Sequence, residues 1–377
     1  MSKNDLSNFT YANEVKLIKG GLEFFQLLKE LIDQAKQTIY FQIYIFDNDP
    51  TGREIANALK AAAERGVRVY LLIDAYASKN LSGSFVDDLK VSGINFRWFK
   101  SSFYGKKFYL GRRLHHKVIV VDSTKSLVCG LNISDKYNDT SESVAWLDWA
   151  LYTKGAASAK LEQVCKRRIN DRSVTTMTGV TEKKCAVKIC VNDWVARKTE
   201  VTKSYLHMMD NARSSIIIMS PYFMPGYLFR RSLKRAVRRG IKVQVILTGV
   251  ADIFVAKFAE KYMYDWLLNL NIEIYEYQIN VLHGKLVVCD RQVVSVGSYN
   301  VNNLSAYASI ELNMEIRDED FAGETQRRLV AIMENDCIRI TRKIHEAKTN
   351  FVKRILRSLS YNFLRFMLLI FAFKQHG

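Results

Sequence analysis

The chain has 377 residues, of which 48 % are apolar, and it carries 56 lysines and arginines against 38 aspartates and glutamates. This composition excludes a disordered chain, a collagen-like repeat and a small disulfide scaffold, and the length is sufficient for two hydrophobic cores. The formal net charge of +18 predicts a partner that carries phosphate groups, either a nucleic acid or an anionic lipid surface.

The cysteine pattern and the apolar runs restrict the class further. None of the six cysteines belongs to a C-x-x-C pair or to a His/Cys group with zinc-site spacing. We therefore expect a reduced, cytoplasmic chain with no metal site and no cofactor. Residues 1–15 lack the apolar stretch of a signal peptide, and no run of about 20 apolar residues could cross a bilayer.

The first half of the chain alternates between helical and strand patterns. Residues 22–36 place apolar side chains at i, i+3 and i+4, which predicts a helix with one face buried on a sheet. Residues 35–46 (AKQTIYFQIYIF) then lead into a strand, and residues 52–73 predict a helix that ends at a glycine before a β-branched strand. Such alternation predicts α/β units with parallel strand pairing.

The second half of the chain repeats this order of elements. Residues 212–223 (ARSSIIIMSPYF) and 226–247 correspond to the strand and helix–strand segments of the first half. We therefore predict an α/β fold of two tandem α/β/α lobes, related by internal duplication, at residues 1–170 and 185–341. The polar segment 171–184 is rich in serine and threonine and is predicted to be a linker.

The tail, residues 342–377, differs from both lobes. Residues 351–373 form a helical apolar stripe with basic side chains beside it, and residues 366–373 are apolar on all sides. This stretch is too short to cross a membrane but suits a helix that lies among lipid headgroups. The arginines favour an anionic surface, and the alternative is a terminal helix packed on a lobe or in a dimer seam.

The strongest functional signal is a group of four residues that occurs twice. The second copy lies 168 residues after the first; the copies are His115, Lys117, Asp122 and Asn132, then His283, Lys285, Asp290 and Asn300. Each His-x-Lys pair adjoins an apolar run, which predicts a buried strand with both side chains on one face. The aspartates follow the histidines at an odd offset, so Asp122 and Asp290 are expected to be structural or to lie behind the catalytic groups.

Two histidines and two lysines in one cleft can carry out phosphoryl transfer. One imidazole can attack phosphorus and form a phosphohistidine, while the other protonates the leaving alcohol and deprotonates the incoming one. Two ammonium groups and two asparagines can hold the phosphoryl oxygens. Each lobe supplies half of this set, so the site is expected at the lobe interface. His116 should point to the other face and is expected to be a bystander or a substrate contact.

The doubled motif resembles the phospholipase D superfamily, which is marked by two copies of H-x-K-x4-D. Within that superfamily the chain is similar to bacterial cardiolipin synthases over most of residues 13–340. Further points of resemblance are S-P-Y-F-M-P at 220–225, G-S-Y-N at 297–300 and W-L-D at 146–148. The first copy departs from the family pattern, because C-G-L-N stands at 129–132 where two glycines or Gly-Ser are common.

The resemblance implies a two-step transfer with named roles. His115 would be the nucleophile, and His283 would be the general acid and base. Acidic residues would orient the two rings, which by position assigns Asp148 to His115 and Glu311 to His283. Glu315, in the same E-x-x-x-E stretch, is the alternative to Glu311.

The second step decides which activity the resemblance implies. A glycerol hydroxyl of phosphatidylglycerol would give cardiolipin and free glycerol; water would give a phospholipase or nuclease; serine or phosphatidylethanolamine would give other lipids. We expect a metal-independent phosphatidyltransferase that makes cardiolipin from phosphatidylglycerol, peripheral on the inner face of the cell membrane. The tail favours lipid over nucleic acid, and the duplication means that an oligomer is not required. A lipid-binding scaffold without catalysis has no use for two complete motifs.

Overall fold

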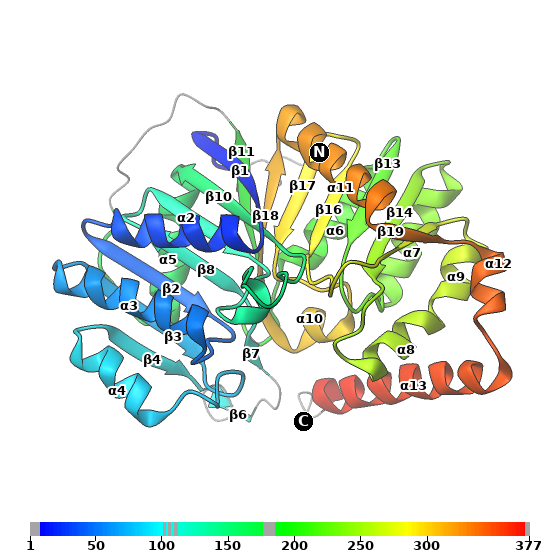
Figure 1. The fold of residues 1–377 in the computed structure, drawn as a ribbon. Helices are drawn as coiled ribbons and strands as arrows, with labels where there is room; N and C mark the ends of the chain where they lie inside the picture. The colour runs from blue at the N-terminus through cyan, green and yellow to red at the C-terminus, as the bar shows by residue number, and fades with distance from the viewer. Residues whose placement is uncertain (1–7, 101–102, 105–106, 109–111, 176–184, 374–377) are drawn as a thin grey trace.

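The computed structural model describes residues 8–100, 103–104, 107–108, 112–175 and 185–373. The chain folds into two lobes that lie side by side, each a sheet with helices on its faces (Figure 1). A long C-terminal helix runs below the second lobe. The expected α/β class, the tandem lobes and the C-terminal helix are confirmed. Residues 176–184, most of the predicted linker, lie outside the described residues, so the lobe boundary stays a prediction.

The first lobe is built on a seven-stranded sheet in the order β1-β10-β9-β8-β2-β3-β4. Strands β2, β3 and β4 pair in parallel, and the remaining neighbours are antiparallel. Its strands are β1 (Asn13–Lys19), β2 (Thr38–Ile43), β3 (Arg68–Asp74), β4 (Asn95–Phe99), β8 (Lys117–Val121), β9 (Lys125–Cys129) and β10 (Trp149–Gly155). Its helices are α2 (Leu22–Asp33), α3 (Pro50–Glu64), α4 (Gly83–Val91), α5 (Ala156–Arg168) and the 3-10 helix η1 (Asp135–Tyr137). The short strands β5 (Phe103–Tyr104) and β6 (Lys107–Phe108) form a separate pair.

The second lobe is built on a ten-stranded sheet in the order β12-β11-β18-β17-β16-β13-β14-β15-β19, with β7 (Arg113–Leu114) of the first lobe added beside β18. Its own strands are β11 (Ala186–Asp193), β12 (Lys198–Thr199), β13 (Ser215–Met219), β14 (Lys242–Thr248), β15 (Glu273–Tyr277), β16 (Leu286–Cys289), β17 (Val293–Gly297), β18 (Ser309–Arg317) and β19 (Cys337–Ile340). Its helices are α6 (Glu200–Asn211), α7 (Tyr227–Arg238), α8 (Phe254–Tyr262), α9 (Tyr264–Asn269), α10 (Asn303–Tyr307), α11 (Glu319–Asn335), α12 (Arg342–Ala347) and α13 (Phe351–Phe373).

Parallel pairing holds for only part of each sheet. In the second lobe β13, β14 and β15 are parallel, as β2, β3 and β4 are in the first. The strands that follow the motif histidines, β8 and β16, pair antiparallel with β2 and β13 and form tight hairpins with β9 and β17. A hairpin turn of a few residues permits only antiparallel pairing, so both sheets are mixed.

The repeated glycines end the equivalent helices of the two lobes, as the sequence predicts. Gly66 follows α3 with φ 88°, and Gly240 follows α7 with φ 82°. An added Cβ at either position would meet no atom within 4 Å. Glycine is therefore favoured there by the left-handed backbone conformation and not by a lack of space for a side chain.

Apolar side chains form three cores, and one of them joins the lobes. One core lies under α2, α3 and α4, and a second lies under α6, α7 and α9. The third contains residues from both sheets together with α5 and α11. Strand β8 is buried on both faces: Val118 and Val120 belong to the shared core, and Ile119 and Val121 to the first-lobe core. This shared core holds the two sheets in a defined relation.

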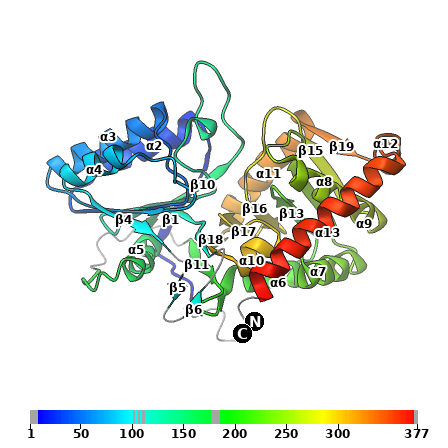
Figure 2. The same ribbon diagram turned by 90° about the horizontal axis from the view of Figure 1, so that it is seen from below.

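Helix α13 lies along α8 (Figure 2). The rings of Tyr361 and Tyr262 stack with centroids 4.6 Å apart. The tail is therefore packed on a lobe along one face, while apolar side chains on its other side stay exposed; these are Phe351, Val352, Ile355, Leu356, Leu359, Phe363 and Phe366. Among the described residues, no helix has the length and apolarity needed to cross a bilayer.

Candidate active site

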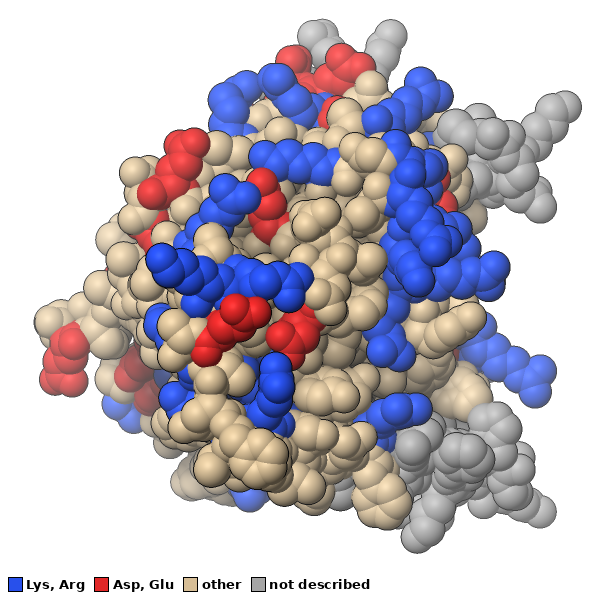
Figure 3. Space-filling view, turned by 90° about the vertical axis from the view of Figure 1, so that its right-hand side faces the viewer, with Lys and Arg blue, Asp and Glu red and all other residues tan. Residues whose placement is uncertain are grey.

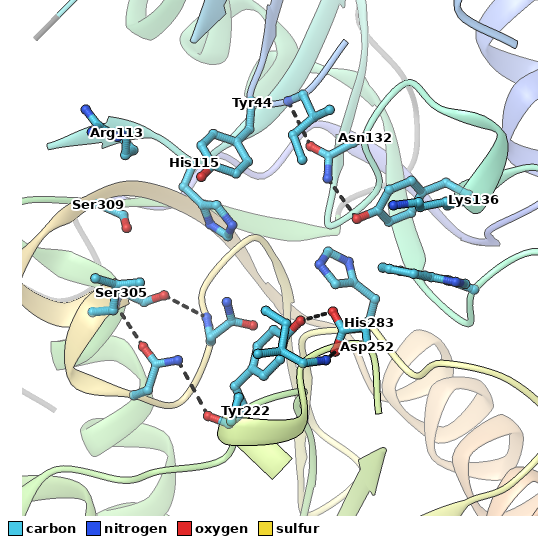
Figure 4. A pocket seen from close by; sticks show the side chains of 18 of the residues that line it. Tyr44, Arg113, His115, Asn132, Lys136, Tyr222, Asp252, His283, Ser305 and Ser309 are labelled. Carbon is cyan, nitrogen blue, oxygen red and sulfur yellow. Dashed lines mark hydrogen bonds between the residues drawn. The ribbon is translucent and has the colours of Figure 1, made fainter. Parts of the chain in front are cut away.

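Both motif histidines line a single cavity of about 590 Å³ between the lobes. Figure 4 shows the rings of His115 and His283 facing the same space from opposite sides. Asn132 and Asn300 of the two motifs also line it. The sequence-based expectation that the two halves meet at one cleft is therefore met in the geometry.

The two histidines lie just outside the strands rather than within them. Strand β8 begins at Lys117, and β16 begins at Leu286. The prediction that each His-x-Lys pair lies within a strand is therefore wrong: His115 lies two residues before β8, and His283 lies three residues before β16. The histidines lie in the segments that lead into these strands. Each of these segments pairs with a segment of the other lobe.

An exchange of backbone hydrogen bonds between the lobes positions the two histidines. Strand β7 pairs in parallel with the start of β18, and the N–H of His115 donates to the carbonyl of Ile310 at 3.0 Å. In the related arrangement, Leu147 and Leu282 form a parallel bridge, and the N–H of His283 donates to the carbonyl of Leu147 at 2.8 Å. Each histidine is thus anchored on the backbone of the opposite lobe.

The carboxylates that orient the imidazoles are exchanged relative to the sequence-based assignment. Nδ1 of His115 lies 2.9 Å from Glu311, and Nδ1 of His283 lies 2.6 Å from Asp148. The assignment of Asp148 to His115 and Glu311 to His283 is therefore wrong. The backbone exchange is the reason, because Glu311 directly follows the residue that binds His115, and Asp148 directly follows the residue that binds His283. Glu315 accepts instead from the Ser204 hydroxyl at 2.7 Å.

The contacts of His115 define its tautomer. A carboxylate only accepts hydrogen bonds, so Nδ1 of His115 carries a proton and its Nε2 offers a lone pair. Nδ1 of His283 has two neighbours, the Asp148 carboxylate at 2.6 Å and Nζ of Lys285 at 2.7 Å, so its Nε2 is likewise the ring nitrogen that faces no protein partner. Glu311 is held by the Ser298 hydroxyl at 2.5 Å, and Asp148 by the N–H of Trp149 at 2.7 Å. Burial lowers the pKa of His115, and burial followed by the ammonium group of Lys285 lowers the pKa of His283. Both pKa shifts favour the neutral imidazole at neutral pH.

The two motif lysines lie behind the imidazoles. Nζ of Lys117 donates to the carbonyl of His115 at 2.6 Å, and Nζ of Lys285 donates to the carbonyl of His283. Neither lysine is among the described residues that line the cavity. Their positions therefore do not support the expectation that the two ammonium groups contact the phosphoryl oxygens directly. Burial lowers the pKa of Lys117 to about 7 and that of Lys285 to about 8. Their positive charge acts on the cavity from one layer beneath its surface.

The two motif asparagines differ in their bonding. The side chain of Asn132 accepts from the N–H of Ile45 at 3.1 Å and donates to the Tyr137 hydroxyl at 2.9 Å. In contrast, Oδ1 of Asn300 is buried without a hydrogen-bond partner. A buried amide oxygen without a partner is costly, so Asn300 is the member of the pair that is free to bind a ligand.

Asp122 and Asp290 have a structural role. The sequence left this role open beside a position behind the catalytic groups. The Asp122 carboxylate accepts the N–H groups of residues 36–38 at 2.8–2.9 Å, and the Asp290 carboxylate those of residues 213–215 at 2.8–2.9 Å. Each carboxylate thus organises the chain where the central strand of its lobe begins. Neither one contacts an imidazole in these hydrogen bonds.

His116 is buried away from the cavity. Its Nε2 lies 2.8 Å from Oε1 of Gln42, and it is not among the described residues that line the cavity. Of the two options that the sequence left open, bystander fits this position and substrate contact does not.

Sequence reasoning missed the aromatic residues that surround the histidines. The ring of Tyr44 packs edge-on against His115 with centroids 4.8 Å apart, and Tyr137 packs against His283 at 5.2 Å. Tyr222 and Asp252 also line the cavity. A signal was present, since Tyr44 and Tyr222 both follow the first parallel strand of their lobe, and ligand sites collect at the carboxyl ends of such strands.

No group of three or more His, Cys, Asp or Glu side chains within the described parts of the chain is arranged to hold a metal ion.

The fold and the paired histidines define a two-lobed protein of the phospholipase D class. The family described as "Cardiolipin synthase, PLD-like domain" matches residues 28–167 and 205–333, one match in each lobe, and the chain belongs to this family.

Relatives and solved structures agree with that membership. The chain is 28 % identical over 366 residues to cardiolipin synthase B of Escherichia coli K12, covering 94 % of this chain and 88 % of that one. It is 27 % identical over 380 residues to the cardiolipin synthase of Clostridium perfringens, covering 95 % and 78 % of the two chains. Phosphatidylserine synthase of Haemophilus influenzae Rd KW20 has the same fold, with a TM-score of 0.74 at 13 % identity over 97 % of each chain.

Proposed function

We propose that this protein is a phosphatidyltransferase that forms cardiolipin from two phosphatidylglycerol molecules and releases glycerol. The observation that carries the proposal is the pair of neutral imidazoles in one cavity, each with Nδ1 on a carboxylate and Nε2 free. The names of the similar proteins point to the same lipid chemistry.

In the first step, Nε2 of His115 attacks the phosphorus of one phosphatidylglycerol. A P–N bond forms, the bond from phosphorus to the glycerol oxygen breaks, and the imidazolium of His283 gives its proton to the leaving glycerol. Burial and Lys285 lower the pKa of His283. The anionic phosphodiester opposes this effect, so substrate binding favours the protonated ring that the step requires.

In the second step, His283 takes the proton from a hydroxyl of a second phosphatidylglycerol. That oxygen attacks phosphorus, the P–N bond breaks, and cardiolipin forms while His115 is restored and His283 is protonated again. Asn300, whose side-chain oxygen has no protein partner, is proposed to accept a hydrogen bond from a substrate hydroxyl beside the reacting phosphodiester. Lys117 and Lys285 stabilise its negative charge from behind the rings. Neither step of this proposed mechanism uses a metal ion.

Membrane association through α13 is part of the proposal. The helix exposes an apolar face, and Phe363 and Leu364 on it also line the cavity. Leu304 of α10 and Ile253 beside α8 are cavity-lining residues that are exposed as well. Lys and Arg side chains spread over the neighbouring side of the second lobe, above the edge where α13 lies (Figure 3). An apolar face next to a basic one suits the surface of an anionic bilayer, with the cavity open to lipid.

The test is conversion of phosphatidylglycerol vesicles by the purified protein in excess chelator. The expected result is one glycerol released for each cardiolipin formed, with loss of both products in His115→Ala. His116→Gln is the matched control, because this neighbouring histidine lies outside the cavity, and it should keep the activity. Phosphatidic acid as the only product, or efficient cleavage of DNA without lipid turnover, would instead identify a phospholipase or a nuclease. Parallel reactions with serine or phosphatidylethanolamine identify the acceptor.

A further inference from the structure

The cavity also contains two carboxylates that do not orient a histidine. Asp47 and Asp252 both line it. Asp47 has the positive charge of Lys136 near it. Asp252 accepts instead from the hydroxyl of Tyr222 and from the N–H of Ile253, the latter at 2.9 Å. A carboxylate repels a phosphodiester, so its presence in a cavity for an anionic lipid requires another explanation.

The partner of Asp252 is held in an unusual backbone conformation. Tyr222 has φ 54°, in the left-handed region that a bulky aromatic residue rarely adopts. Hydrogen bonds of the two residues that follow Tyr222 hold the loop: Glu260 accepts the N–H of Phe223 at 3.1 Å, and the N–H of Met224 donates to the carbonyl of Val301 at 3.0 Å. Strain that is maintained in this way, in a residue that lines the cavity, indicates that the position of the phenol matters.

The pair lies on the His283 side of the cavity. Figure 4 shows Asp252 and Tyr222 on the same side of the cavity as His283. The negative charge of Asp252 also acts on Lys285, directly behind that imidazole, where it favours the ammonium form. The pair is therefore placed beside the base that activates the incoming alcohol in the proposed second step.

We propose that Tyr222 and Asp252 form the subsite for the acceptor polyol. One glycerol hydroxyl of the incoming phosphatidylglycerol gives its proton to His283 and attacks phosphorus, while the neighbouring hydroxyl donates a hydrogen bond to the Asp252 carboxylate. Tyr222 fixes the orientation of that carboxylate. A vicinal diol satisfies both contacts at once, whereas water or a simple alcohol satisfies only one. The pair is thus specificity-determining, and this inference rests on the proposed function.

A soluble-acceptor assay tests the subsite directly. The enzyme is given phosphatidylglycerol vesicles and either isotope-labelled glycerol or 1-propanol, and transfer to each alcohol is measured as a function of its concentration. The wild type should prefer glycerol in kcat/KM, mainly through a lower KM. In Asp252→Asn that preference should fall about tenfold or more, and the ratio of cardiolipin to phosphatidic acid should fall with it, because a charged acceptor has been lost. Formation of the His115 intermediate from phosphatidylglycerol should also slow, because the leaving glycerol of the first step lies at the same place beside His283.

Two further variants keep the test decisive. Tyr222→Phe removes a single oxygen and should reduce the glycerol preference in the same direction, so it decides the question if Asp252→Asn does not fold. Asp87→Asn makes the same charge change on a surface side chain that is 71 % exposed, and it should behave as wild type. Unchanged preference and product ratio in both cavity variants, with a wild type that makes cardiolipin, overturns the subsite alone. A wild type that makes no cardiolipin overturns the proposed function.

Discussion

His115 and Glu311 are 196 residues apart in the chain and belong to different lobes, yet Nδ1 of the histidine lies 2.9 Å from the carboxylate. His283 has the reciprocal relation to Asp148 of the first lobe, at 2.6 Å. Each lobe therefore supplies one imidazole together with the carboxylate that orients the imidazole of the other lobe. A lobe on its own contains a complete H-x-K motif but no oriented histidine.

Substitution of the two histidines should block different steps of the reaction. His115→Ala removes the nucleophile and should give no covalent intermediate. His283→Ala should still form some phosphatidyl-His115 and then resolve it slowly, because the base for the second step is missing. Acid quenching followed by peptide mass spectrometry measures the adduct. An adduct on residue 283 in the wild type would reverse the assigned roles.

Substitution of each exchanged carboxylate should slow the steps that use the histidine it contacts. Glu311→Gln should slow mainly the formation of the intermediate. Asp148→Asn should slow formation and also breakdown, because His283 transfers protons in both proposed steps. Each loss should be about 10²–10⁴-fold, the range expected when an oriented catalytic imidazole loses its carboxylate. Rapid-quench measurement of the intermediate separates the two effects. Glu315→Gln is the control, since Glu315 accepts from Ser204 and Arg317 rather than from an imidazole, and both rates per folded molecule should stay near wild type. The opposite assignment of the two slow steps would contradict the observed pairing.

Activity should have a bell-shaped dependence on pH. Burial lowers the pKa of His115 below its ordinary value of 6.5, so protonation of the nucleophile should reduce kcat/KM only below that pH. On the alkaline side, Lys117 and Lys285, with pKa values of about 7 and 8, lose the positive charge that attracts the phosphodiester. We expect kcat/KM to start falling near pH 7 and to be low above pH 9. A profile that stays flat to pH 10 would exclude a role for these ammonium groups.

Asp290 should matter for stability more than for chemistry. Burial alone would raise its pKa, but its hydrogen bonds to backbone N–H groups reverse the shift and lower it below 3.8. The folded state therefore favours the ionised form, and this stability is present above pH 3.8 and lost as the pH falls further. Asp290→Asn should reduce the free energy of unfolding at pH 7 by about 1–3 kcal/mol. Chemical denaturation measures this loss, and the difference from wild type should shrink below pH 4.

The same variant should retain the kcat of the wild type per folded molecule. A large loss of kcat at full folding would place Asp290 in the catalytic machinery after all.

The exposed face of α13 should determine binding to membranes. Val352→Ser with Leu359→Ser removes two apolar side chains that are 61 % exposed and do not line the cavity. Binding to vesicles that contain phosphatidylglycerol should weaken about 10- to 100-fold in sedimentation assays. Val91→Ser with Val174→Ser, two side chains that are 88 % exposed elsewhere, is the matched control. Equal binding of both double variants would show that α13 is not the docking surface.

The sequence was sufficient for the local and repeated features of the protein. Helix and strand periodicity depends on neighbouring residues, so the α/β class, the two lobes and the glycine ends at Gly66 and Gly240 could be predicted. The motif histidines could be found because the repetition at a constant offset of 168 residues marks them without any knowledge of the fold. The tail was also visible as an amphipathic helix, although its packing against α8 was not.

Only the tertiary structure decided which residues meet. Contacts between the lobes depend on the register of β7 against β18 and of Leu147 against Leu282, and neither pairing has a periodic signal in the chain. That register joins His115 to Glu311 and His283 to Asp148, where order along the sequence suggested the reverse. Tyr222 and Asp252, which are 30 residues apart, meet for another reason: they follow the neighbouring parallel strands β13 and β14 of the second lobe. Sequence spacing reports the geometry within one element, whereas the meeting of distant side chains is determined by how whole sheets pack against each other.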